Sequence, residues 1–170
     1  HSLEVQLPFL QLTQKNFKIV PILLSGMFSL SDCRKLGKDI ATAIKNSGSK
    51  ILIIASSDMS HFPTDSDARI VDISALKAME SFNVEKLARD INSSMSKKYE
   101  NMSCVLCGQE AVFTTMYAAQ FLGADAAVIL NYTNSSEMSG DKSRVVGYGA
   151  ATFIKASEKL KVKSEKVKAI

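Results

Sequence analysis

The chain lacks several features that would assign it to a special class of protein. Its 170 residues include no tryptophan, three prolines and two histidines. No apolar run approaches the roughly 20 residues that a membrane-spanning helix needs, so no span is predicted. Three cysteines are an odd number, and no secretory signal precedes them, so the sequence does not predict a disulfide framework. A reducing cytoplasm is the expected location.

Excess positive charge is confined to one end of the chain. The formal net charge is +4, but residues 155–170 are rich in lysine and the remainder is about neutral. Nucleic-acid binding requires a basic face with interleaved aromatic residues, so no nucleic-acid partner is predicted. The length suits one domain with its own core. We therefore expect a domain over residues 1–154 and a basic tail over residues 155–170.

Strand and helix patterns alternate through the first third of the chain. Apolar, β-branched runs at residues 17–24 and 50–55 predict strands. Between them lies a helical pattern that Ser29 or Ser31 can cap and that Gly48 ends. A strand, a helix and a strand in this order form a βαβ unit with parallel strands. The sequence therefore predicts an α/β fold with a mainly parallel sheet flanked by helices.

The rest of the chain continues this alternation. Thr64 and Asn83 are predicted helix caps, and Ile70, Ile73, Leu76 and Met79 are the predicted inward face of the first of these helices. The further elements are expected helices over 64–79, 83–91 and 104–122, loops over 92–101 and 131–142, and strands over 126–130 and 144–154.

The predicted strand at residues 50–55 leads directly into residues that can carry chemistry. Ser56-Ser57-Asp58 follows it, and His61 comes three residues later. Ligands of open α/β sheets bind at the carboxyl ends of the strands, and an imidazole titrates near neutral pH. His61 is thus a candidate acid/base with Asp58 as its partner. A purely structural hydrogen bond from this histidine is an equal alternative.

Cys104 and Cys107 form a Cys-x-x-Cys pair at the start of a predicted buried helix. Helix N-termini favour the thiolate, so Cys107 is a candidate metal ligand, redox thiol or nucleophile. A structural zinc site needs four ligands, and the sequence has no second cysteine pair to supply them. Cys104 is better explained as a small residue that fills the core, whereas for Cys107 a structural role and a functional one are equal alternatives.

Other polar residues are weaker candidates. His1 and Glu4 are three positions apart, so on a helix they would share a face and either bind a metal or close a polar contact. Asn131 and Ser135 lie in a polar segment after a predicted strand, either at the rim of a site or in a turn. The chain begins without methionine in a sequence that already resembles a protein interior, and we expect that a front part precedes it.

Several short motifs occur in a fixed order along the chain. They are residues 1–8, Ser56-Ser57-Asp58 with His61, Leu106-Cys107-Gly108, Asn131-Tyr132 with Ser135-Ser136, and residues 141–151. Together they resemble the MEMO protein family, whose fold is similar to that of the class III extradiol dioxygenases. The resemblance implies a cleft at the strand ends, where His61 matches the dioxygenases' acid/base and Cys107 falls where they supply a carboxylate ligand to iron.

The resemblance also implies function. It favours a metal-dependent redox protein that uses iron or copper, because a thiolate ligand suits a softer metal. It implies further metal-facing histidines upstream of His1, with the C-terminal half to two-thirds of such a protein present here. It also implies signalling or radical-SAM protein partners. A non-catalytic module that holds a small molecule or peptide, and a hydrolase with Cys107 as nucleophile, are the alternatives. Met59-Ser60, Phe62-Pro63 and Cys104 depart from the family pattern.

Overall fold

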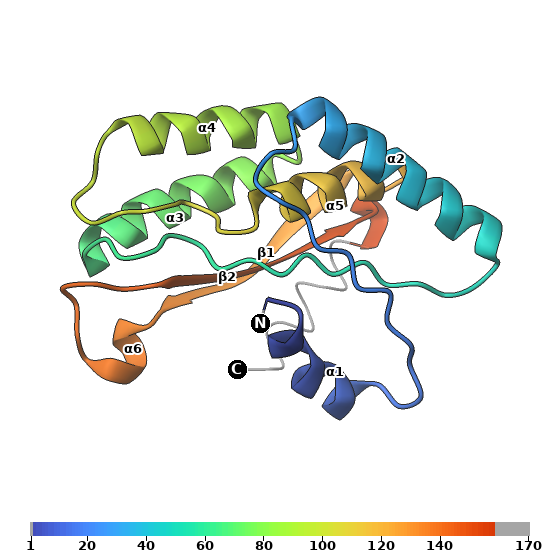
Figure 1. Ribbon diagram of the computed structural model, residues 1–170, viewed down its shortest axis with the longest axis horizontal. Helices are drawn as coiled ribbons and strands as arrows, with labels where there is room; N and C mark the ends of the chain where they lie inside the picture. Colours follow the sequence, from blue (N-terminus) through green and yellow to red (C-terminus); the bar gives the residue numbers. More distant parts are fainter. Residues whose placement is uncertain (1, 159–170) are drawn as a thin grey trace.

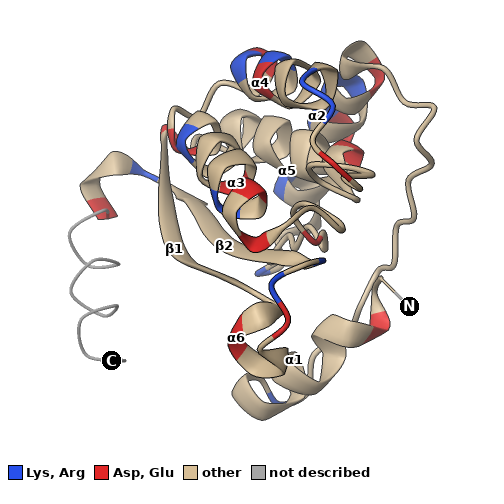
Figure 2. Cartoon of the chain, turned by 90° about the vertical axis from the view of Figure 1, so that its left-hand side faces the viewer, with Lys and Arg blue, Asp and Glu red and all other residues tan. Residues whose placement is uncertain are grey.

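The computed structural model describes residues 2–158, and its sheet has two strands. Strands β1 (Ala126–Asn134) and β2 (Gly147–Ile154) pair antiparallel. Their register is irregular between Ile129 and Asn131. Neither strand contains a charged residue, whereas Lys, Arg, Asp and Glu lie on the helices around them (Figure 2). The strands are therefore built for apolar contact.

Four helices gather on one side of this β1–β2 ribbon (Figure 1). They are α2 (Leu30–Ser47), α3 (Asp65–Glu80), α4 (Val84–Ser96) and α5 (Gln109–Phe121). Helix α2 packs along α5, and α3 contacts α4 and both strands. The core therefore lies between these helices and one face of the ribbon.

The smaller elements lie around this body. A 3-10 turn η1 (Glu4–Gln6) leads into α1 (Leu7–Thr13), which lies on the side of the ribbon away from α2–α5 (Figure 1). Helix α6 (Ser136–Ser139) connects the two strands, and η2 (Ala156–Glu158) follows β2. No helix within residues 2–158 is long and apolar enough to cross a membrane.

The predicted helix caps are confirmed. The Ser29 hydroxyl accepts from the Asp32 N–H, and the Asp32 carboxylate accepts from the Ser29 N–H at 3.0 Å, which is a capping box. Asn83 accepts from the Lys86 N–H at the start of α4 in the same way. Gly48 ends α2 in the left-handed conformation with φ of 64°. These signals are local, which is why the sequence alone located them.

Element boundaries in the second half were predicted less well. Helix α4 continues to Ser96, into the region predicted as a loop, and β1 and α6 occupy much of the predicted 131–142 loop. Helix α5 begins only at Gln109, so both Cys104 and Cys107 precede it. The predicted inward face of α3 was right for Leu76 and Met79, which are buried, and wrong for Ile70 and Ile73, which are 59% and 37% exposed.

The predicted mainly parallel sheet is not shown by the described residues. Segments 17–24 and 50–55 run without strand pairing, and the one sheet within residues 2–158 is antiparallel. An apolar β-branched run indicates a segment suited to burial, but a strand forms only beside a partner that takes its hydrogen bonds. The apolar side chains stay exposed instead: Val20 is 86%, Leu23 79% and Leu52 76% exposed.

Close packing of α2 on α5 depends on a glycine. Gly37 is buried, and a methyl group added there would lie 2.8 Å from the Thr114 carbonyl oxygen and 2.9 Å from the Ala118 nitrogen. Both atoms belong to the backbone of α5, which cannot turn aside as a side chain can. The two helices therefore approach as closely as they do because position 37 has no Cβ.

We expect Gly37→Ala to lower the free energy of unfolding by about 1 to 3 kcal/mol, the usual cost of overpacking. Gly26→Ala is the matched control, since a methyl group there meets nothing within 4 Å. Urea unfolding of the two variants measures the difference. Equal midpoints would show that α2 and α5 can separate freely.

The start of α3 is joined to the end of β1 through Asp65. Its carboxylate accepts hydrogen bonds from the Asn134 amide at 2.7 Å, the Ser136 hydroxyl at 3.3 Å and the Arg69 guanidinium at 3.0 Å. The hydrogen bond from Asn134, followed by the charge of Arg69, lowers the pKa of Asp65 from its ordinary value. The ionised carboxylate is thus the form that the fold stabilises.

Because the pKa of Asp65 is lower in the folded protein than the unfolded-state pKa of 3.8, the ionised carboxylate adds stability above pH 3.8. This stability is lost as the pH falls through the folded-state pKa. Asp65→Ala should therefore destabilise the protein most near neutral pH and progressively less in acid. Urea unfolding of wild type and variant between pH 7 and pH 3 tests this. A stability difference that stays constant over this range would contradict the charged role of Asp65.

Candidate functional site

The loop that carries His61 is attached to the first residue of β2. Met59 N–H donates to the Gly147 carbonyl, and Gly147 N–H donates to the Ser60 carbonyl, both at 2.9 Å. On the other side, His61 N–H donates to the Cys104 carbonyl at 3.2 Å. The backbone of His61 is therefore held between the start of β2 and the segment that leads into α5.

Three of the predicted site residues come together. His61 Nε2 lies 3.3 Å from Asp58 Oδ2, and the Asp58 backbone N–H donates to Cys107 Sγ at 3.1 Å. One nitrogen, oxygen or sulfur ligand atom from each of Asp58, His61 and Cys107 lies within 4.8 Å of the other two. Within residues 2–158 this is the group of acidic, histidine and cysteine side chains that could hold a metal ion.

Solvent reaches this group. The Asp58 side chain is 48% exposed and that of His61 is 23% exposed, and Cys107 is exposed. A ligand or a metal ion can therefore approach without a rearrangement of the core. The half-buried imidazole is the member whose direction the surrounding protein controls most.

Cys107 is placed by contacts of the residues beside it. Ser57 Oγ accepts from the Gly108 N–H at 3.0 Å and donates to the Asp58 carbonyl at 2.7 Å. A Cβ on Gly108 would lie 2.7 Å from the Ser56 carbonyl oxygen, so only glycine permits this approach. The thiol is therefore presented to Asp58 by the Cys-Gly step immediately before α5.

Cys104 stands apart from the group. Its thiol lies 4.0 Å from the Met59 carbonyl and is partly buried. Burial raises the pKa of the Cys104 thiol, and the neighbouring Cys107 adds to this effect. A protonated thiol is a poor metal ligand, so the geometry agrees with the core-filling interpretation of Cys104.

The weaker candidates are placed elsewhere. His1 lies outside the described residues, and Glu4 lies on η1 and does not belong to the group. Asn131 is exposed on β1, opposite Ala150. Ser135 supports the connection between the strands, because its hydroxyl accepts from the Val146 N–H at 3.1 Å. None of these residues shares the group of three.

Sequence reasoning missed two residues that contact the loop. Gln6, on η1, donates its side-chain amide to Ser56 Oγ at 3.0 Å. Asp72, on α3, is completely buried, and its Oδ1 accepts from the Ser60 N–H at 3.0 Å. Burial raises the pKa of Asp72, and the hydrogen bond from Ser60 opposes that rise. The available signal for the burial of Asp72 was its spacing, because it lies four positions from Ala68 and from Leu76 and so shares a helix face with these apolar residues.

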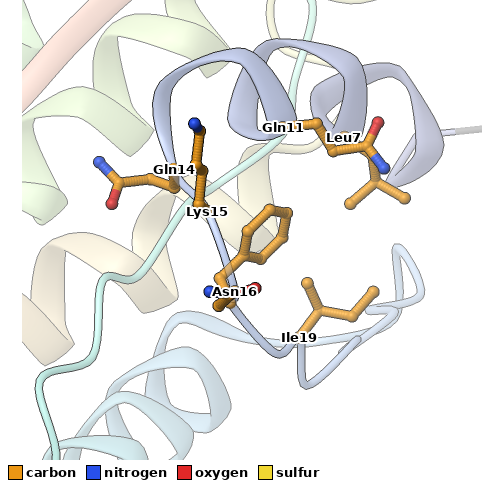
Figure 3. A pocket seen from close by; sticks show the side chains of 7 residues that line it. Leu7, Gln11, Gln14, Lys15, Asn16 and Ile19 are labelled. Carbon is orange, nitrogen blue, oxygen red and sulfur yellow. The ribbon is translucent and has the colours of Figure 1, made fainter.

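Hollows in the described part of the chain lie beside the site and away from it. One, of about 620 Å³, separates residues 51–55 from β2 and borders the site at Ser57 and Met59. The other, of about 570 Å³, lies between α1 and the extended segment that follows it, where Leu7, Gln11 and Ile19 line it (Figure 3). Lys15 is the only charged one among the described residues that line this second hollow, so the hollow has few groups that could catalyse a reaction or bind a metal.

Comparison with known proteins identifies relatives over most of the chain. A MEMO1 family protein of Methanobrevibacter smithii is 38% identical over 157 residues, which cover 90% of this chain and 51% of that protein. MEMO1 family proteins of Methanosarcina mazei and Archaeoglobus fulgidus are each 36% identical, and the matches cover 88% and 90% of this chain and 53% and 54% of those proteins. The chain spans about half the length of these curated relatives.

The family model described as Memo-like protein matches residues 1–152. This match includes the Asp58 loop, the Cys107-Gly108 step, all of β1 and residues 147–152 of β2. The resemblance expected from the ordered motifs is thereby confirmed, and the chain belongs to the Memo-like protein family.

Proposed function

We propose that the chain contributes the Asp58, His61 and Cys107 side of a metal-dependent redox site that binds iron or copper. The observation that carries the proposal is the gathering of their ligand atoms within 4.8 Å of one another. A carboxylate, an imidazole and a thiolate together suit iron or copper better than they suit magnesium or calcium. When bound, such an ion would supply one-electron chemistry.

The residues would divide the work by their chemistry. Cys107 would be the ligand of the ion, since the Asp58 N–H directs its sulfur into the group. His61 would accept or deliver a proton, and Asp58 would orient the imidazole through the 3.3 Å contact with Nε2. The exposure of Asp58 leaves room for a substrate. Further ligands would come from a segment equivalent to the part of the longer relatives that lies outside the match with this chain.

Metal analysis of the full-length protein tests this proposal. We expect wild type to retain iron or copper, Cys107→Ser to lower the bound metal about tenfold or more because it removes the thiolate ligand, and His61→Ala to lower it less because it removes a group beside the ion. Cys104→Ser is the matched control, because that thiol lies close by but outside the group. A wild type without metal, or metal content unchanged in both site variants, would refute the site.

The sheet is part of the same proposal. We propose that residues 17–24 and 50–55 become strands of a larger, mainly parallel sheet, like that of the class III extradiol dioxygenases, in the full-length protein. Exposed aliphatic side chains support this, because Ile19, Ile51 and Ile54 are each close to half exposed. Soluble proteins rarely leave such contiguous apolar surface open to water.

Amide hydrogen exchange tests the sheet. In the full-length protein we expect slow exchange at alternate residues of 17–24 and 50–55, as strand hydrogen bonds require. The chain of residues 1–170 should exchange faster at the same positions, while α2 serves as the internal reference. Equally fast exchange in both forms would mean that these segments do not join a sheet.

A non-catalytic binding module is the second candidate function. The cavity beside Ser57 and Met59 favours it, since apolar side chains line much of its wall and ligand pockets are mostly apolar. A small molecule or a peptide would be held there without chemistry at His61. A hydrolase with Cys107 as nucleophile, radical-SAM or signalling partners and a cytoplasmic location stay predictions.

A further inference from the structure

Asp72 is a buried charged residue that the proposed chemistry does not use. Its exposure is 0%, and a carboxylate is costly to bury unless its oxygens are paired. Both oxygens have partners: Oδ1 accepts from the Ser60 N–H at 3.0 Å, and Oδ2 accepts from the Tyr132 hydroxyl at 2.9 Å. One side chain on α3 therefore joins β1 to the loop that carries His61.

The surrounding backbone is shaped around this carboxylate. A Cβ on Gly147 would overlap the Asp72 carboxylate and lie 3.1 Å from Met59 Cβ. Gly147 also exchanges backbone hydrogen bonds with Met59 and Ser60. The missing side chain at position 147 thus provides the space that Asp72 occupies, directly behind the residue that precedes His61.

Phe62, the residue that follows His61, is held in an unfavourable backbone conformation. Phe62 has a positive φ of 73°, which a residue with a large side chain adopts only when its surroundings impose it. Its N–H donates to the Val145 carbonyl at 2.7 Å, and the Arg144 guanidinium lies 4.2 Å from the centre of its ring. The direction of the His61 side chain is therefore set by anchors on both neighbouring residues, and Asp72 is the anchor on the Ser60 side.

We propose that Asp72 is the positioning residue of the site, and that its hydrogen bond to Ser60 directs the His61 imidazole toward Asp58 and Cys107. The hydrogen bonds of Asp72 reach neither the imidazole nor the thiol, so their effect on His61 passes through the backbone of Ser60. A charge on the imidazole acts on the Asp72 carboxylate through space as well, and Asp72→Asn, which removes the charge and keeps an acceptor, separates the two effects. The inference rests on the proposed function, because it names Asp72 as the residue that orients the acid/base of the proposed site.

The test is made on the full-length protein without added metal. Asp72→Ala removes both acceptors, whereas Asp72→Asn keeps an amide oxygen that can still accept from the Ser60 N–H. Gly37→Ala is the control for lost stability, because it disturbs the contact between α2 and α5 and meets none of the residues that hold the His61 loop. Two readouts are followed: the NMR signals of the His61 ring, assigned with His61→Ala, and amide exchange at Ser60.

In Asp72→Ala we expect the His61 ring signals to shift and the Ser60 amide to exchange about tenfold or more faster, as loss of a charge-assisted hydrogen bond implies. Asp72→Asn should restore both readouts toward wild type, and Gly37→Ala should leave them unchanged despite its loss of stability. Should Asp72→Ala not fold, Asp72→Leu, which has no acceptor, takes its place.

Equal changes in the Asp72→Ala and Gly37→Ala spectra would reduce Asp72 to general stabilisation and overturn the inference. So would an Asn variant that behaves like Ala, because the hydrogen bond to Ser60 would then not be the cause. These readouts require no bound metal. A wild type that binds no iron or copper would refute the proposed redox site. The His61 ring signals and the Ser60 amide exchange would still decide whether Asp72 orients His61.

Discussion

The close approach of the His61 loop to the first residue of β2 is the constraint on which the site depends. Two backbone hydrogen bonds join Gly147 to Met59 and Ser60, and they form only because position 147 has no side chain. The space so created holds the Asp72 carboxylate. Helix α3, the loop and the sheet thus meet at one glycine, and the orientation of the functional side chains follows from how they meet.

The sequence predicted best what short-range chemistry determines. The caps at Ser29 and Asn83 need a partner only three residues away, so their pattern is complete within a few residues. Strand formation at residues 17–24 and 50–55 depends on a partner that is distant in the chain or outside it. The apolar pattern there favours burial, but it carries no information on what would provide it, and Val20, Leu23 and Leu52 stay exposed in the structure.

The site shows the same division. Asp58 and His61 are three residues apart, so their contact could be predicted from the end of the apolar run. Cys107 is 49 residues from Asp58, and its approach was expected only through the family resemblance. Asp72 escaped notice because a single aspartate on an amphipathic helix is usually solvated. Its burial depends on Gly147 and Tyr132, which no local pattern connects to it.

The unpaired segment at residues 50–55 and the exposed site are continuous in the chain. Residues 51–55 line the cavity beside β2, and they lead without interruption into Ser56 and Asp58. Helices cover the ribbon on one side (Figure 1), while Ile51, Leu52 and Ile54 stay exposed. If residues 50–55 join a larger sheet, as we propose, their partner would also fix the segment from which Asp58 projects. Under that proposal, completion of the sheet and completion of the ligand set would be a single structural event, since both meet at the end of this segment.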